Sequence, residues 1–185
     1  DDTSLSAARE EMKATDAPVD GAQLLSYLTK SGRLTPFQAK RVGEGRSGEL
    51  VLGNYLILNR IGRGGMGAVY KARQEGIDRM VAIKILPEEL GHDVKFALRF
   101  TREARTLAKL SHPNIVALYE FGNVNGTYFF LMEYVPGSTL RDVVQSGELA
   151  PEHALAIVPQ LCDALQYAHD QGVIHRDIKP ENILM

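Results

Sequence analysis

Three glycines are spaced Gly62-x-Gly64-x-x-Gly67, a pattern that suits phosphate binding. Phosphate binding needs glycine because backbone N–H groups must come close to the phosphate oxygens, and a side chain would block that approach. The pattern alone is weak, because ordinary glycine-rich turns are common and dinucleotide-binding folds carry a similar sequence. A dinucleotide-binding loop opens a helix, whereas runs with strand character, 55–61 and 68–72, flank these glycines. The flanks therefore favour a phosphate-binding hairpin.

A lysine follows on the next apolar segment. Residues 80–86 alternate as a strand that ends at Pro87, with Ala82 and Lys84 on the same face. A lysine in this place can reach phosphates, while the small alanine leaves room for a flat base. A lone lysine in a strand is more often a surface residue whose ammonium group extends into water. A second residue is needed to decide between the two interpretations.

Glu103 supports the phosphate-binding interpretation. Residues 95–110 have apolar side chains at helical spacing, and Glu103 lies three positions after Phe100 and four before Leu107. A carboxylate on an apolar stripe needs a partner, because an unpaired buried charge is expensive. Neighbouring arginines of the helix lie mainly on its polar side. The expected partner is Lys84, and the ion pair would direct the lysine at the phosphates.

The end of the chain carries a further pattern. Residues 175–182 read His-Arg-Asp-Ile-Lys-Pro-Glu-Asn and match H-R-D-x-x-x-x-N, the catalytic loop of protein kinases. With the glycine loop, the strand lysine and the helix glutamate in the same order, the chain resembles a protein kinase of the eukaryotic type. The resemblance covers about residues 52–185. The wording of the glycine loop and of residues 112–116 is similar to the bacterial serine/threonine branch, the Hanks-type kinases.

The resemblance implies catalytic and metal-binding roles. Asp177 would accept the proton of the substrate hydroxyl, Asn182 would bind Mg²⁺, and Lys179 would contact the γ-phosphate. Lys84 would hold the α- and β-phosphates, and Glu103 would hold Lys84 in place.

The resemblance also implies an ATP site between the glycine hairpin and a hinge at 133–135. Backbone groups of the hinge would bond the edge of the adenine, and Met132 would control access to the pocket behind it. Val69 and Ala82 would pack on the adenine ring. The implied cofactors are ATP and Mg²⁺, and the implied nucleotide-binding residues are Ile61, Gly62, Gly64, Gly67, Val69, Ala82, Lys84, Met132, Glu133 and Val135.

The implied function is ATP-dependent phosphorylation of protein serine and threonine hydroxyls. The sequence stops at Met185, before the place of a D-F-G triplet whose aspartate would bind the second magnesium ion. We therefore expect the chain by itself to bind nucleotide weakly and to be inactive, although the parent protein would be an active kinase. The alternative is a pseudokinase that binds nucleotide without transferring phosphate, or a scaffold for interactions.

The expected fold is α+β, with a kinase-like small lobe of antiparallel sheet plus one helix and only the first part of a helical large lobe. A short helical extension precedes the small lobe, with a frayed helix at 4–13 and two firmer helices at 20–30 and 35–42. Two such helices cannot bury a core alone, so they must dock on the kinase lobe or on a partner. The expected domains are an extension and linker at 1–52, a small lobe with hinge at 53–135, and a partial large lobe at 136–185.

Composition agrees with a globular protein. Of 185 residues 44% are hydrophobic, and the net charge of −2 predicts no attraction to nucleic acid or to acidic membranes. No apolar run reaches the ~18 residues that would indicate a spanning helix, so we expect a cytoplasmic protein. The single cysteine, Cys162, excludes an internal disulfide and is expected to be buried.

A long helix at 151–171 has a wide apolar arc. In the kinases that the chain resembles, the corresponding helix packs on later parts of the large lobe. Without them the arc would face water, and exposed apolar area of that kind favours association. We therefore expect a homo-oligomer formed through this helix.

Overall fold

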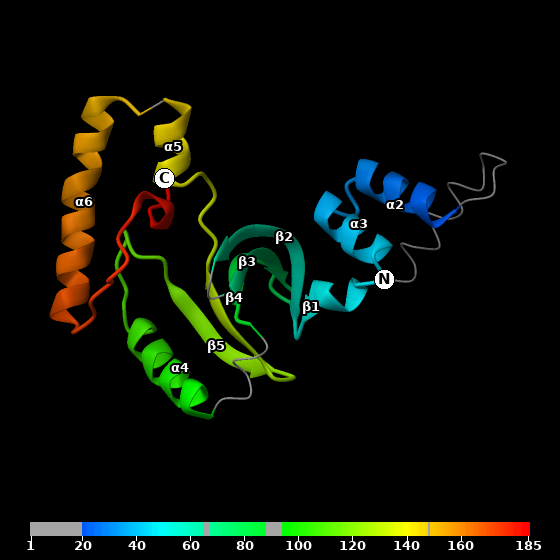
Figure 1. Cartoon of the computed structure of the whole chain (residues 1–185), viewed down its shortest axis with the longest axis horizontal. Helices are drawn as coiled ribbons and strands as arrows, with labels where there is room; N and C mark the ends of the chain where they lie inside the picture. Colours follow the sequence, from blue (N-terminus) through cyan, green and yellow to red (C-terminus); the bar gives the residue numbers. More distant parts are fainter. Residues whose placement is uncertain (1–19, 65–66, 88–93, 148) are drawn as a thin grey trace. The chain divides into compact units, whose positions relative to one another are not determined.

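The computed structural model describes residues 20–64, 67–87, 94–147 and 149–185. The described residues form two compact units, one made of residues 20–64 and 68–80 and the other of residue 67 with 81–185. The helices and strands, most of them labelled in Figure 1, are α2 (Gly21–Lys30), α3 (Pro36–Gly43), β1 (Val51–Leu52), β2 (Tyr55–Gly64), β3 (Gly67–Gln74), β4 (Arg79–Ile85), α4 (Val94–Leu107), β5 (Leu118–Val124), β6 (Thr127–Glu133), α5 (Leu140–Ser146) and α6 (Pro151–Asp170), with short 3-10 helices at Ser47–Leu50 and Pro180–Asn182.

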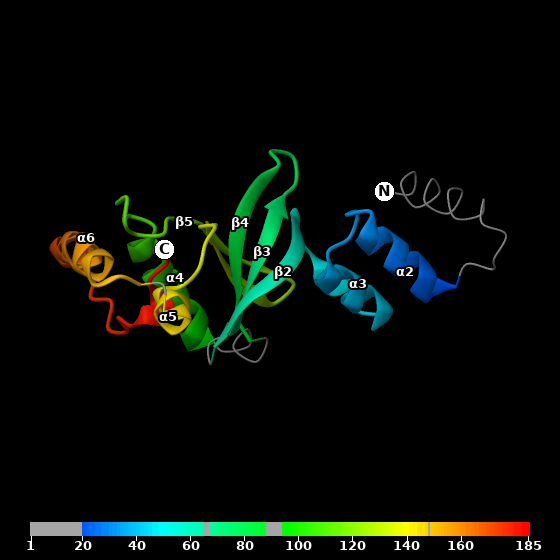
Figure 2. The same ribbon diagram turned by 90° about the horizontal axis from the view of Figure 1, so that it is seen from above.

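The first unit combines the glycine hairpin with the two N-terminal helices. Its strands follow the order β1-β2-β3, and β1 pairs antiparallel with the first two residues of β2. Tyr55 and Ile57 of β2 and Ala72 of β3 are buried. Figure 2 shows α3 beside β2 and α2 beyond it. In space, therefore, the described part of the expected extension belongs with the glycine hairpin.

Both N-terminal helices begin where the sequence predicts, because each has a capping box. The side chain of Asp20 accepts a hydrogen bond from the Gln23 N–H at the start of α2. Thr35 accepts one from the Gln38 N–H at the start of α3, and Pro36 occupies the first turn. These bonds satisfy backbone donors that a helix start otherwise leaves unpaired. The helix predicted at 4–13 lies outside the described residues.

The second unit contains the strands β4, β6 and β5 in that order, all antiparallel. The β5–β6 hairpin turns at Asn125 and Gly126, which have φ angles of 50° and 87°. Positive φ at both central residues is what the preferred two-residue hairpin turn requires, and asparagine and glycine adopt it most easily. The predicted turn is confirmed. The strand β6 leads directly into the segment predicted as the hinge.

Helix α4 packs on this sheet through aromatic rings. Phe100 is 5% exposed, and its ring lies 4.5 Å from that of Phe130 and 5.0 Å from that of Tyr128, measured between centroids. One turn further along the helix, Ala104 is fully buried. Figure 1 shows α4 alongside β5. The buried stripe thus follows Phe100 and Ala104, whereas the predicted stripe residue Leu107 is 40% exposed.

Helix α6 is longer than any other described helix, and among its described side chains only those of Ala164 and Ala168 are buried. Leu155 and Val158 are exposed. The predicted burial of Cys162 is wrong, because its thiol side lies on the exposed part of the helix. Within the described residues, no helix combines the length and apolar character needed to cross a membrane.

The packing of α4 gives a direct test of the core. We expect Phe100→Ala to lower the free energy of unfolding by about 3–5 kcal/mol, because it removes a buried ring from an aromatic cluster. Leu98 lies on the same helix and is 69% exposed, so Leu98→Ala serves as the matched control. Urea denaturation followed by circular dichroism measures both variants. Equal losses in the two variants would contradict this description of the core.

Candidate active site

The predicted glycine hairpin is present, and both of its arms are strands. Gly62 and Gly64 lie at the end of β2, and Gly67 begins β3. A Cβ atom on Gly62 would lie 3.6 Å from Cβ of Val69 across the hairpin. Because a strand and not a helix follows the glycines, the dinucleotide-binding alternative is excluded. Ile61 is 49% exposed and Val69 is half-buried.

The third glycine of the pattern has a structural reason of its own. Gly67 has a φ of 113°, and a Cβ atom there would lie 2.1 Å from the carbonyl oxygen of Ile85. Any other residue would be strained and would collide with the backbone of β4. Gly67 is therefore required for the close approach of its own backbone to β4.

Lys84 lies on β4, where the sequence predicted it. Its partner in the register with β6 is Phe130, and the partner of Ala82 is Met132. Ala82 is buried and Lys84 is half-buried. The two residues share one face of the strand because they are two positions apart. The predicted combination of a small residue and a lysine on one face is confirmed.

The predicted ion pair between Lys84 and Glu103 is absent from the described residues, where Glu103 is exposed. The physical reason lies in the helical period. Phe100 and Ala104 are four positions apart and share the face that packs on the sheet, whereas Glu103 is turned by about 100° from Ala104. The expectation that Glu103 lies on the buried stripe is wrong for this state of the chain.

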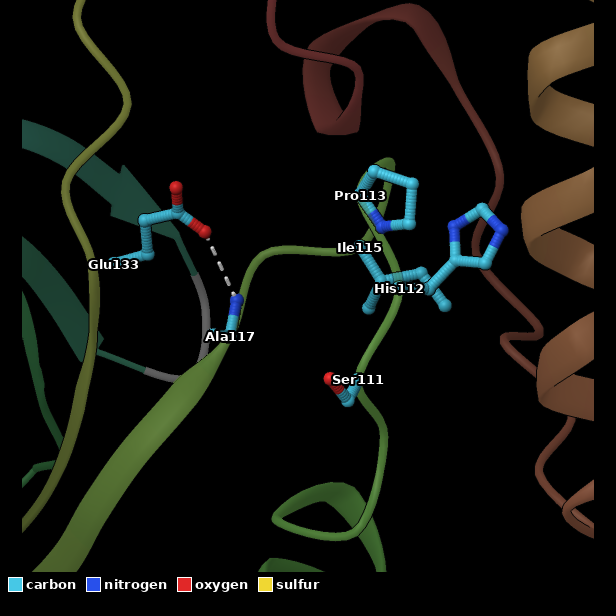
Figure 3. A pocket seen from close by; sticks show the side chains of 6 residues that line it. All are labelled: Ser111, His112, Pro113, Ile115, Ala117 and Glu133. Carbon is cyan, nitrogen blue, oxygen red and sulfur yellow. Dashed lines mark hydrogen bonds between the residues drawn. The ribbon is translucent and has the colours of Figure 1, made fainter.

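The hinge residue Glu133 holds the start of β5. Its carboxylate accepts a hydrogen bond from the Ala117 N–H at 3.3 Å, and its own N–H donates to the Ala117 carbonyl at 2.9 Å. Figure 3 shows this contact beside an open pocket of about 310 Å³ lined by Ser111, His112, Pro113, Ile115, Ala117 and Glu133. Glu133 therefore fixes the beginning of the hinge through both its backbone and its side chain.

The catalytic-loop residues predicted from the motif lie close together. The Lys179 ammonium nitrogen is 2.8 Å from Oδ2 of Asp177. The Asn182 side-chain amide donates to the Asp177 carbonyl oxygen at 2.8 Å and to Oδ2 at 3.1 Å. Arg176 has a φ of 64°, a left-handed conformation that is strained for a residue with a side chain. The loop thus combines backbone strain with two side-chain contacts to the Asp177 carboxylate and a third to its backbone carbonyl.

These contacts shift the pKa of Asp177 and that of Lys179. The hydrogen bond from Lys179, and after it the one from Asn182, hold the pKa of the Asp177 carboxyl below its ordinary value. The same contact raises the pKa of Lys179 above its ordinary value. Asp177 is therefore ionised and Lys179 is charged at neutral pH, although both side chains are partly exposed to water.

Asn182 fits a magnesium ligand. Its NH₂ group is occupied by Asp177, and its oxygen accepts no hydrogen bond from the described residues. Mg²⁺ prefers oxygen ligands and is often bound by one or two protein groups together with substrate phosphates and water. Within the described part of the chain, no cluster of three or more histidine, cysteine, aspartate or glutamate side chains forms a metal site.

A second set of contacts joins the segment after the predicted hinge to residues 181–185, and no sequence pattern indicates it. Thr139 and Leu184 form an antiparallel bridge, and Arg141 forms an ion pair with Glu181 at 2.6 Å. A Cβ atom on Gly137 would lie 2.1 Å from the Met185 carbonyl oxygen. Figure 1 shows the red C-terminal segment beside α5. Gly137, Arg141 and Glu181 are ordinary residues when the sequence is considered alone. Their roles become evident only when the structure brings the two segments together.

Comparisons with known proteins agree with these motifs. The family "Protein kinase domain" matches residues 55–185. The chain is 45% identical over 139 residues to the serine/threonine-protein kinase PrkC of Bacillus subtilis, covering 75% of this chain and 22% of that protein. It is 45% identical over 130 residues to the serine/threonine-protein kinase PknB of Mycobacterium leprae, covering 68% of this chain and 21% of that protein.

A solved structure supports the fold. The crystal structure of the PknI kinase domain of Mycobacterium tuberculosis has 31% sequence identity and a TM-score of 0.62, covering 72% of this chain and 55% of that chain. The chain spans about a fifth of the length of the curated relatives named above.

The pKa of Asp177 provides a test of the loop geometry. We expect Lys179→Met to raise this pKa towards the ordinary aspartate value, because the hydrogen bond that lowers it is lost. Carboxyl chemical shifts measured against pH by NMR report the change. Arg141→Met, which removes the nearby pair with Glu181, is the control and should leave the pKa of Asp177 in place.

The same shifts set a pH window for the loop. A carboxyl whose pKa is lowered on folding stabilises the folded state above its unfolded pKa, and this contribution is lost as the pH falls through the folded pKa. A lysine whose pKa is raised contributes below its unfolded pKa and loses the contribution as the pH rises through the folded one. The contact between Lys179 and Asp177 should therefore persist through neutral pH and weaken in acid. An Asp177 that titrates at the ordinary value in the unmodified chain would contradict the geometry.

Proposed function

The chain belongs to the protein kinase family and is of the bacterial, eukaryotic-like serine/threonine type, and on this premise we propose that the protein containing it phosphorylates serine and threonine hydroxyls of proteins with ATP. The predicted α+β fold, with a kinase-like small lobe and the first helices of the large lobe, is confirmed by the similarity to the PknI kinase domain. The arrangement of Asp177, Lys179 and Asn182 is the single observation that carries the proposed activity.

Asp177 is the group proposed to receive the substrate hydroxyl. With its lowered pKa the carboxylate is a weak base, so it does not remove the proton before the reaction begins. Phosphoryl transfer has a loose transition state, in which little negative charge is needed on the attacking oxygen at first. A weak base is then sufficient: it orients the hydroxyl and takes its proton late, as the oxygen–phosphorus bond forms.

The positive charge next to Asp177 belongs to Lys179, and its proposed role is to stabilise the transferred phosphate. Lys179 lies 2.8 Å from the carboxylate, so a hydroxyl held by Asp177 would also be near an ammonium group. That ammonium can stabilise charge on the transferred phosphoryl group. Asn182 would hold Mg²⁺ through its free oxygen, and the ion, when bound, neutralises charge on the ATP phosphates. The nucleotide-binding roles of the glycine hairpin, Met132, Glu133 and Val135 belong to the same proposal.

Lys84 and Glu103 require a change of state in this proposal. Protein kinases need the pair between these two positions in place for activity, and movement of the helix controls it. Here Glu103 is exposed and makes no ion pair with Lys84. We therefore propose that α4 turns about its axis when the active state forms, which would bring Glu103 towards β4.

The missing ion pair between Lys84 and Glu103 also favours the second candidate function, which is nucleotide binding without phosphoryl transfer. The two functions differ in one measurement, because a pseudokinase would bind ATP with Mg²⁺ and give no phosphoprotein. A protein substrate remains the proposed partner. Because ATP is supplied in the cytoplasm, that compartment remains the proposed location of the kinase segment.

Replacement of Asp177 tests the proposed activity. In the protein that contains this chain, we expect Asp177→Asn to lower the rate of transfer from radiolabelled ATP by about 10²–10⁴-fold, the usual loss when a positioned proton acceptor is removed. Asp170→Asn is the control, because it changes the same charge at an exposed place on α6 where the amide oxygen can still accept from Gln166. Undiminished transfer by Asp177→Asn would rule out the proposed role.

Self-association through α6 remains a second expectation. Leu155 and Val158 are 73% and 53% exposed on this helix, and apolar side chains of this kind favour association. We expect the chain of residues 1–185 to form oligomers at micromolar concentration, and Leu155→Glu with Val158→Glu to shift it towards the monomer. Light scattering after size-exclusion chromatography measures the mass, and a monomer of 20.4 kDa for the unmodified chain would contradict the expectation.

A further inference from the structure

The helical segment at 20–50 lies outside the part of the chain that matches the kinase family, which begins at residue 55. It is nevertheless packed against β2, the strand that carries Gly62 and Gly64. Two side-chain hydrogen bonds to β2 come from Thr35 and Gln38 at the start of α3. Figure 2 shows this helix beside β2 within the first unit.

Gln38 makes the most buried of these contacts. Its side chain is a polar group on a helix, yet the residue is only 4% exposed. Its Nε2 donates to the Ile57 carbonyl oxygen at 2.9 Å, and its Oε1 accepts from the Thr35 N–H at 2.9 Å. Burying a side-chain amide is costly unless both its NH₂ group and its oxygen are hydrogen-bonded. A glutamine suits this position because Ile57 and Thr35 supply those two partners.

Thr35 makes the second contact and also helps to position Gln38, which makes the first. Its hydroxyl donates to the Leu58 carbonyl oxygen, the neighbour of the carbonyl that Gln38 reaches. The same oxygen accepts from the Gln38 N–H and so caps α3. Strand β1 pairs with β2 only as far as Leu56, and the two side chains bond the next two carbonyl groups of the strand. The N-terminal cap of α3 therefore bonds the part of β2 that follows its pairing with β1.

The helix also contacts the other arm of the glycine hairpin. The ring centroids of Phe37 and Tyr70 lie 6.0 Å apart, and Tyr70 is on β3, three positions after Gly67. Arg41, one turn later on the same helix, also contacts the Phe37 ring. Its guanidinium carbon lies 5.3 Å from the ring centroid. Thus one helical turn contacts both strands that carry the three glycines.

From these contacts we propose that the first turn of α3 positions the glycine-rich hairpin for nucleotide, and that Thr35, Phe37 and Gln38 are positioning residues for ATP. This inference rests on the proposed function. Gly62 lies four residues beyond Leu58, which is about 13 Å along a strand that rises ~3.3 Å per residue. A small change in the direction of β2 at Ile57 and Leu58 would therefore displace the backbone N–H groups proposed to bond phosphate.

The expected kinetic effect is specific. The hairpin would contact ATP equally in the bound complex and in the transition state, so a shifted hairpin weakens binding without changing the chemical step. A residue that only stabilises the fold would instead reduce the amount of active protein and leave the KM for ATP unchanged.

Thr35 offers a matched set of variants. Thr35→Val removes the hydroxyl with little change of shape, and Thr35→Ser keeps it and should restore both hydrogen bonds. Asp20→Ala is the control for stability, because it removes the same kind of cap from α2, and the described hydrogen bonds of Asp20 join it only to Gln23 of the same helix. Gln38→Met keeps the length of the side chain and removes its bonds to Ile57 and Thr35.

In the protein that contains this chain, we expect Thr35→Val and Gln38→Met to raise the KM for ATP by about three- to tenfold, the effect of losing the one hydrogen bond that each side chain makes to β2. Their kcat should stay within about twofold, since the chemical step is untouched. Hydrogen exchange should become faster in 55–64 and 67–74. Thr35→Ser and Asp20→Ala should leave the KM for ATP as in the unmodified protein.

Several outcomes would overturn the inference. An unchanged KM for ATP in a folded Thr35→Val protein would do so, and so would an equal rise of KM in Asp20→Ala, which would indicate a general loss of stability. If Gln38→Met does not fold, Thr35→Val decides. If the unmodified protein transfers no phosphate from ATP, the proposed function fails separately, and unchanged hydrogen exchange of 55–64 in Thr35→Val would then refute the positioning role.

Discussion

The pairing of β6 on both of its edges is the constraint on which the candidate site depends. On one edge its register with β4 sets Lys84 opposite Phe130 and Ala82 opposite Met132. On the other edge the tight hairpin with β5 fixes the strand in place, and Glu133 closes that pair with a backbone and a side-chain hydrogen bond. Because side chains alternate along a strand, a slip of one residue would turn Lys84 to the opposite face of the sheet. Strand β6 then ends at the hinge, so the same register determines where the hinge begins.

Helix α4 illustrates which of two forces decides the orientation of an element. Its aromatic contacts bury large apolar surfaces, each worth a few kcal/mol, whereas an ion pair near the surface contributes about 0–1 kcal/mol. The helix therefore orients Phe100 and Ala104 towards the sheet and leaves Glu103 in water. An active arrangement that uses Glu103 must repay the loss of some of this packing. In the proposed function, nucleotide could supply this free energy only by binding the active arrangement more tightly than the present one.

The features that the sequence predicted correctly are those with local causes. The capping boxes at Asp20 and Thr35, the Asn125–Gly126 turn and the strands around the glycines depend on residues a few positions apart. The grouping of Asp177, Lys179 and Asn182 follows from a contiguous motif. The sequence could not predict the side chains whose environment depends on distant partners. Gln38 is buried where the Ile57 carbonyl group of β2 and the Thr35 N–H bond the two ends of its amide. Cys162 and Glu103 are exposed because other residues of their helices take the packed face. The pair of Arg141 and Glu181 joins segments too far apart in sequence for any periodic signal.

The bridge between Thr139 and Leu184 has a consequence for synthesis on the ribosome. The segment after the hinge has no partner strand until residues 183–185 have been made, about 45 residues later, whereas β4, β5 and β6 are complete by Glu133. At a translation rate of ~5–20 residues per second, that interval lasts about two to nine seconds. The nascent sheet can close in that time, but the catalytic loop cannot yet be anchored. The contacts between the segment after β6 and residues 183–185 therefore form after the sheet has been made.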